Sequence, residues 1–352
     1  MAEEAMEKRT PVGAFAGAVG FAVTVLALSV LYYGKDFLIP VAIAIVVWYL
    51  INALATALER VPILSRLPRW TFMAFALLII LFLSTAVGRL IGANVSDMID
   101  GYPAYRDHLV ALADKVSARI GLPVQDYVEN FFKEFDFRPW IASIASGLTS
   151  VLGTLGLVVT YVAFMLVEQT RFSEKLAHLA SDPARLTAIK IALARMQRQI
   201  ETYVWVKTFA SLLTGLASWV VLVLVGVDNA PFWALLAFLL NYIPTIGSIL
   251  GVVLPALMAL VQFDTLTPFL IVTGGLGIAQ FLTGNVLEPP LMGETLNISP
   301  LVVMLSLVLW GMLWGLAGMF LCVPITVILL IVLAQFPATR GIAVLLSGTG
   351  RV

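Results

Sequence analysis

Long apolar segments alternate with two polar segments along this chain. Nearly uncharged windows occur at about residues 12–33, 37–57, 70–93, 145–167, 204–227, 231–262, 266–285 and 299–336. A helix needs roughly 20 apolar residues to cross a hydrocarbon core of about 30 Å, and most of the windows reach that length. The pattern predicts an all-α, polytopic membrane protein with about eight membrane segments.

Two windows, 231–262 and 299–336, are longer than one crossing requires. Glycine and proline interrupt both, and such residues free backbone groups from helical pairing or allow close approach. Each window is therefore expected to be a broken helix or a re-entrant hairpin. The alternatives are a tilted or kinked single span and, for the second window, two closely spaced spans. The interruptions are Pro244, Gly247 and Gly251 in the first window and Gly315, Gly318 and Pro324 in the second.

The two polar segments differ in charge. Residues 94–144 hold five basic and eight acidic side chains, a net charge of −3, whereas residues 168–207 hold seven basic and four acidic ones, a net charge of +3. Because cytoplasmic loops carry the excess of Lys and Arg, the second segment is expected inside and the first outside. Both read as amphipathic helices, and the second has a turn at Ser181-Asp182-Pro183.

These features divide the chain into six parts. An even number of crossings places both termini in the cytoplasm. The parts are a three-span unit at 1–93, an extracytoplasmic helical insert at 94–144, a fourth span at 145–167, a cytoplasmic helical hairpin at 168–203, a C-terminal transport half at 204–336 and a cytoplasmic tail at 337–352.

Composition narrows the possible functions. Of the residues, 61% are hydrophobic and 12% are charged, and 21 basic residues balance 21 acidic ones, so nucleic acid is not an expected partner. There is no phosphate-binding loop, dinucleotide fingerprint or zinc-protease motif, and His108 and His178 are predicted on opposite sides of the membrane. We expect no enzyme, no metal and no cofactor.

The remaining polar residues of the C-terminal half are candidates for a substrate or ion path. No Lys or Arg occurs between Lys207 and Arg340, and only four carboxylates do. Ionisable groups at membrane depth usually face a water-filled path or a partner, although Glu288 has the structural alternative of capping free backbone N–H groups. The candidates are Lys207, Asn241, Gln280, Asn285 and Glu288.

The stretch GNVLEPPLMGETLNISP, residues 284–300, holds the most prominent candidate. Pro289 and Pro290 should stop the preceding helix, and Gly293 permits a tight turn before the next membrane segment. We therefore expect Glu288 to lie on a short, stiff, non-helical connector.

The C-terminal half resembles the autoinducer-2 exporter family, a group of bacterial inner-membrane proteins. The carrying stretches are IETYVWVKTFASLLTGL, GVDNAPFWALLAFLLNYIPTIGSILGVVLPAL and GNVLEPPLMGETLNISPLVVMLSLVLWGMLWGLAGMFLCVPITVIL. The resemblance implies a bacterial inner-membrane transporter that forms a symmetric homo-oligomer, such as a pentamer, with each protomer carrying its own path.

Three positions depart from the family pattern. Family members usually carry a basic residue where this chain has Pro290, often another where it has Glu294, and many carry a Glu where Gln335 stands. Without the two cations, Glu288 lacks the counter-ions expected next to it in the sequence.

The resemblance and the residues leave three functions open. The first is export of a small polar solute, autoinducer-2-like, by a passive or ion-coupled mechanism. The second is a cation/proton antiporter in which Glu288 carries H⁺ or Na⁺, so these ions are the candidate coupling ions. The third is a membrane scaffold that uses its two amphipathic inserts and moves no solute.

Overall fold

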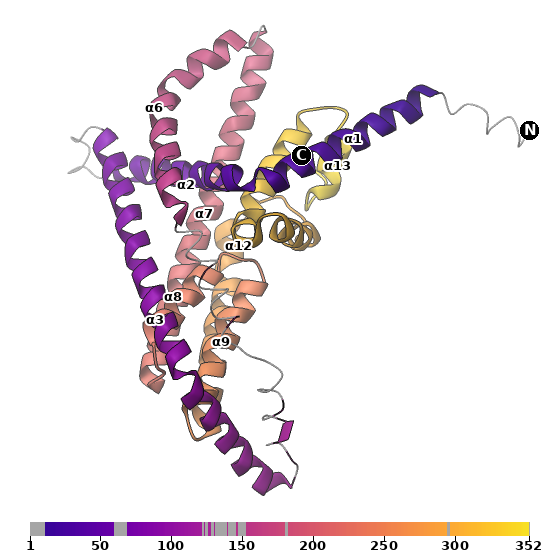
Figure 1. Cartoon of the computed structure of the whole chain (residues 1–352). Coiled ribbons are helices and arrows are strands. Elements are labelled where there is room, and N and C mark those ends of the chain that lie inside the picture. Colours follow the sequence, from indigo (N-terminus) through magenta and orange to yellow (C-terminus); the bar gives the residue numbers. More distant parts are fainter. Residues whose placement is uncertain are drawn as a thin grey trace, which may run out of the picture.

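The structure, a computed structural model, describes residues 11–59, 69–121, 153–179, 182–293 and 296–351, with a few isolated positions between 122 and 152. Every regular element in these ranges is a helix, as the apolar pattern predicted (Figure 1). The helices are α1 (Pro11–Tyr33), α2 (Lys35–Glu59), α3 (Arg69–Ile120), α6 (Leu155–Leu179), α7 (Pro183–Val225), α8 (Ala230–Leu240), α9 (Ile246–Gln262), α10 (Leu266–Phe281), η1 (Leu282–Leu287), α11 (Glu288–Met292), α12 (Pro300–Ala334) and α13 (Arg340–Leu346).

Within the described residues, five helical stretches are long and apolar enough to cross a membrane. Several of the predicted windows are thereby confirmed as apolar helices, whereas the number of crossings stays a prediction. The stretches are Lys35–Asn52, Leu155–Phe172, Leu186–Val225, Leu266–Met292 and Pro300–Ala334.

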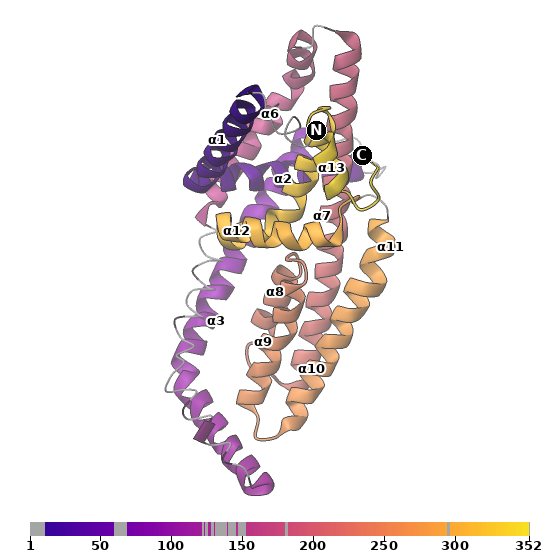
Figure 2. The same cartoon turned by 90° about the vertical axis from the view of Figure 1, so that its right-hand side faces the viewer.

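The two polar segments extend from opposite ends of the molecule (Figure 2). At one end, α3 continues from the third apolar window into the acidic segment as one helix of 52 residues, without a break near residue 94. At the other end, α6 and α7 meet at the predicted turn, where the carboxylate of Asp182 caps α7 by accepting from the backbone N–H of Ala184 at 3.0 Å. Most of residues 122–152, Ser181 and the arginine-rich loop at 60–68 lie outside the described residues.

The window 231–262 folds into a helical hairpin made of α8 and α9. The chain turns at Asn241–Thr245, where Pro244 has no N–H to offer and Thr245 adopts a φ of 60°. At the open end, the side chain of Gln262 accepts from Asp228 N at 2.7 Å and donates to the Gly226 carbonyl at 2.9 Å. The start of α8 and the end of α9 therefore lie side by side.

The window 299–336 also doubles back, within α12. Gly315 has φ 60° and ψ −140°, which no α-helix contains. Gly318 consequently packs so closely on Trp310 that an added Cβ would lie 2.6 Å from the Trp310 carbonyl carbon. Residues eight apart in a straight helix are about 12 Å apart, so the two halves of α12 form a second hairpin.

The prediction of a non-helical connector around Glu288 is wrong. The chain stays helical from Leu266 to Met292, passing from α10 through the π-helical segment η1 into α11. A π-helical turn is wider than an α-turn, and the two prolines that follow it occupy the first turn of α11, where their missing N–H groups and their rings are tolerated. Glu288 thus lies one turn before the end of a long helix.

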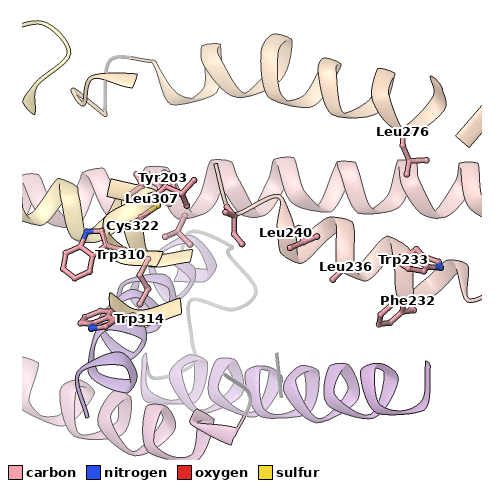
Figure 3. Packing of buried hydrophobic residues seen from close by; sticks show 14 of the residues in the cluster. Tyr203, Phe232, Trp233, Leu236, Leu240, Leu276, Leu307, Trp310, Trp314 and Cys322 are labelled. Carbon is pink, nitrogen blue, oxygen red and sulfur yellow. The ribbon is translucent and has the colours of Figure 1, made fainter. Parts of the chain in front are cut away.

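The hydrophobic core lies mainly in the C-terminal half and joins both hairpins to α7. Figure 3 shows a row of α8 side chains, Phe232, Trp233, Leu236 and Leu240, and near the other end Tyr203 of α7 beside the α12 residues Leu307 and Cys322. The N-terminal helices join this core through α2 and through α1, whose Leu31 carbonyl accepts from Trp314 Nε1 at 2.9 Å. The core thereby positions the polar residues that follow.

The C-terminal tail packs against the connector between α11 and α12. Asn297 accepts from Thr349 N and Oγ1, both at 3.0 Å, and its side-chain amide donates to the Arg351 carbonyl. Ser299 N donates to the Leu346 carbonyl at 3.1 Å. The tail is thus fastened to the segment that follows Glu288.

Candidate functional site

An ion pair joins Lys207 of α7 to Glu288 of α11. The ammonium lies 2.8 Å from Oε2 and 3.0 Å from Oε1, and the side chains are only 11% and 14% exposed. Two charges withdrawn from water are stable only while they remain paired. Lys207 is separated from Glu288 by 81 residues in the sequence, so it supplies the counter-ion that the neighbouring sequence lacks.

Asn241 connects this ion pair to the first hairpin. The Lys207 ammonium also donates to the Asn241 backbone carbonyl at 3.3 Å. This carbonyl lies at the end of α8, where no following helical turn supplies an N–H partner. The buried Asn241 side chain donates to Ser211 Oγ at 3.1 Å and accepts from Gln280 Nε2 at 2.8 Å. One residue at the hairpin turn thus bonds to both α7 and α10.

A further bond holds the same turn against α7. The Tyr242 hydroxyl donates to Thr208 Oγ1 at 2.8 Å, next to the Lys207 and Asn241 contact. We call Lys207, Thr208, Ser211, Asn241, Tyr242, Gln280 and Glu288 the polar cluster. It lies where α7, the turn of the first hairpin and the α10–α11 helix meet.

Four of the five candidate side chains therefore come together, and Asn285 does not. The Asn285 side chain is exposed and donates to the Phe281 carbonyl at 3.3 Å within its own helix. Thr208, Ser211 and Tyr242 were not among the candidates. Ser211 follows Lys207 by one helical turn, so a search for polar residues at helical spacing could have found it.

The predicted backbone breaks have different roles. Gly247 and Gly318 allow the close approach of the two helices within each hairpin, and Gly315 makes the second turn. Gly251 makes only ordinary contacts with Ala237, and Pro324 lies buried inside α12. Gly293, with a φ of 52°, ends α11 after Pro289 and Pro290. The residues at the two turns and Gly293 interrupt the helices, whereas Gly251 and Pro324 do not.

The polar cluster can bind a polar solute, and its ion pair can exchange one charged partner for another. It presents one cation, one carboxylate, two amides and three hydroxyl groups, which suit hydrogen bonding to a polar solute or neutralisation by a small cation. Among the described residues, no group of three or more His, Cys, Asp or Glu side chains is arranged to hold a metal ion.

Comparisons with known proteins identify the family of this chain. The family model of AI-2E family transporters matches residues 21–338. The AI-2 transport protein TqsA of Escherichia coli is 30% identical over 330 residues, 92% of this chain and 93% of its own length. A putative transport protein of Haemophilus influenzae is 28% identical over 94% of this chain and 95% of its own length. These matches cover both hairpins and the polar cluster, and the chain belongs to the AI-2E family of membrane transporters.

Proposed function

We propose that this transporter exports a small polar solute, autoinducer-2-like, by a passive or ion-coupled mechanism, and that the Lys207–Glu288 pair gates the path. The observation that carries the proposal is that the Lys207 ammonium makes two contacts at once. It pairs with Glu288 at 2.8 Å and also holds the turn of the first hairpin through the Asn241 carbonyl. A change at the ion pair therefore affects one of the contacts that hold the turn against α7.

The gating step is an exchange of partners. A polar group of the solute can replace Glu288 as the partner of Lys207, and a proton or cation can neutralise Glu288 instead. Either exchange removes part of the attraction that keeps these two charges together in surroundings of low dielectric constant. The ammonium is then free to leave the Asn241 carbonyl, and the turn can move relative to α7.

A liposome efflux assay tests this proposal with one double variant. Glu288→Gln or Lys207→Met alone leaves one buried charge without its partner, so each is expected to be destabilising. Lys207→Met/Glu288→Gln removes both charges and nearly preserves volume. We expect the double variant to be expressed and to melt close to the wild type, yet to lose most efflux of polar solutes.

The matched control is Asn285→Ala, because its exposed amide lies on the same helix and bonds only to its own backbone. This control is expected to transport like the wild type. If the double variant exports every solute of the panel at the wild-type rate, the ion pair is structural and the proposed gate is wrong. If neither it nor the wild type moves any solute, and the protein co-purifies stoichiometrically with another protein, the scaffold function is favoured.

Cation/proton antiport is the second candidate function. It is favoured by the presence of a single carboxylate, Glu288, facing a single ammonium, because H⁺ or Na⁺ can take the place of Lys207. The same liposomes distinguish the two functions. Antiport requires that an imposed Na⁺ gradient drives proton movement without any organic solute, whereas solute export requires the solute.

We also propose that both hairpins are re-entrant. The α8 helix has 11 residues and is therefore about 16 Å long, too short to cross a core of about 30 Å, and Gln262 holds the two ends of the α8–α9 hairpin together. With the first hairpin re-entrant and both termini cytoplasmic, Glu288 lies at the cytoplasmic end of its helix. Cysteines at the exposed positions Thr265 and Leu291 should then react from the periplasm and from the cytoplasm, respectively.

The family resemblance further supports a homo-oligomer, such as a pentamer, in the bacterial inner membrane. Close-packing surfaces rich in small residues favour helix association in lipid. Native mass spectrometry in mild detergent is expected to give one symmetric oligomer, and a monomer as the only species would contradict it.

A further inference from the structure

A cavity of about 250 Å³ lies behind the polar cluster, between the N-terminal helices and the two hairpins. Its walls come from α2, α3, α7, the first hairpin and α12. Representative lining residues are Val46, Val47, Val87, Tyr203, Tyr242 and Phe320. The cavity therefore lies where both hairpins meet the part of the chain outside them.

The lining side chains are aliphatic or aromatic, and only two of them carry a polar atom. The Tyr242 hydroxyl is already bonded to Thr208. The Tyr203 hydroxyl is buried and has no hydrogen-bond partner among the described residues. A stably bound water needs two to four polar partners, and a polar solute loses its hydration without replacement. One free hydroxyl does not supply these partners, so the cavity is unfavourable for water and for the polar solute of the proposed export function.

A hydrocarbon fits both the size and the chemistry. An apolar cavity of about 150 Å³ in another protein is large enough to bind benzene, so one of 250 Å³ holds a longer apolar group. Leaving such a volume empty sacrifices the dispersion contacts of every lining atom. An apolar occupant is therefore favoured over an empty cavity.

The position of α3 indicates where this hydrocarbon comes from. Val87 of α3 lines the cavity, and the preceding turns of α3 expose Phe75, Leu78 and Phe82. Exposed apolar side chains of this kind are expected where a helix contacts lipid. Since acyl chains are the solvent around α3, they are present at far higher concentration than any other apolar molecule.

We propose that the cavity binds an acyl chain of a membrane lipid and that this chain helps to hold the two hairpins in place. The acyl chain lies against Leu239 and Tyr242, on either side of Asn241 in the sequence. It also lies against Leu316 and Ala317, which follow the turn at Gly315. Tyr242 fastens the first turn to α7, next to the Lys207 contact. The bound chain is thus a structural ligand of both turns, distinct from any transported solute.

Photo-crosslinking tests the occupant in nanodiscs that contain phosphatidylcholine with a diazirine at the middle of one acyl chain. Mass spectrometry of the wild type is expected to find crosslinks on Tyr242 or Phe320, in addition to those on the lipid-exposed Phe82. Val47→Phe fills the cavity from α2 and should reduce the cavity crosslinks at least fivefold while leaving those on Phe82 unchanged. Val220→Phe, the same change at an exposed position on α7, is the matched control.

A second cavity-filling variant and a second photo-reagent complete the test. Ala317→Leu fills the cavity from α12 and replaces Val47→Phe if that variant does not fold. A free phenyl diazirine without an acyl chain reports small apolar molecules. The proposal is overturned if Phe82 is crosslinked by the lipid but the cavity is not, if the filled variants are crosslinked there as strongly as the wild type, or if only the free phenyl diazirine labels the cavity.

Discussion

Replacement of Gly247 by alanine perturbs the first hairpin at its tightest point. The Cβ of an alanine at this position would lie 2.6 Å from the carbonyl carbon of Leu240, closer still to its oxygen, and 3.1 Å from Ile243 Cβ. Real Cβ atoms essentially never approach another heavy atom within 3.0 Å. Because the first two contacts are backbone, no side-chain rotation relieves them, and α9 must move away from the end of α8.

The size of the effect follows from what that movement breaks. Overpacking a dense core costs about 1–3 kcal/mol, and a clash with backbone belongs at the upper end of that range or above it. The Leu240 carbonyl also accepts from Ile243 N at 2.8 Å, and the next residue is Asn241, which bonds to Lys207. A loss of about 3 kcal/mol is expected to lower the melting temperature by on the order of 5 °C or more.

The assay is thermal unfolding of the purified protein in one detergent, followed by solute efflux from liposomes. Gly251→Ala is the matched control, because it lies one turn further along α9 and its Cβ would meet Ala237 only at 3.5 Å, an ordinary contact. Gly318→Ala in the second hairpin should behave like Gly247→Ala. If Gly247→Ala and Gly251→Ala melt and transport alike, the close packing of the first hairpin has no energetic importance and the reasoning is refuted.

Three other outcomes are expected. Lys207→Met leaves Glu288 buried without its counter-ion and should destabilise the protein by about 3–5 kcal/mol, and a melting temperature equal to that of the wild type would contradict this. Asn297→Ala removes side-chain bonds to the C-terminal tail, so hydrogen exchange of the tail amides should become at least tenfold faster. Unchanged exchange would show that other contacts hold the tail. Cysteines at Ser117 and Ser181, in a protein without its native cysteine, should be labelled from opposite sides of the membrane; labelling of both from the periplasm would exclude the predicted topology.

The helical, membrane-spanning class was predictable because it depends on local composition. An apolar run of sufficient length in lipid must pair its backbone groups within itself, so a helix is the expected structure wherever the neighbours lie. The turn before Pro183 was predictable for a similar reason, since Asp182 and proline form a local N-terminal cap. The interruptions at Pro244 and Gly315 were also visible, because proline and glycine change the backbone directly.

The failed prediction at Glu288 shows the limit of such local rules. Two prolines in succession normally end a helix, but here a preceding π-helical turn changes the geometry that receives them. Local sequence rules do not distinguish these two outcomes, whereas the structure shows α10, η1 and α11 all packed against α7.

By itself, the sequence determined the class of this protein, the positions of the breaks in the two long windows and the residue types able to form a polar site. Only the tertiary structure decided which of them meet. Lys207 and Glu288 form a pair because α7 and the α10–α11 helix lie side by side, and Asn285 is excluded because its position on the same helix faces outward. The physical reason is that burial and pairing of a charge depend on neighbours brought together by packing, whereas helix formation and helix breaking depend on residues a few positions away.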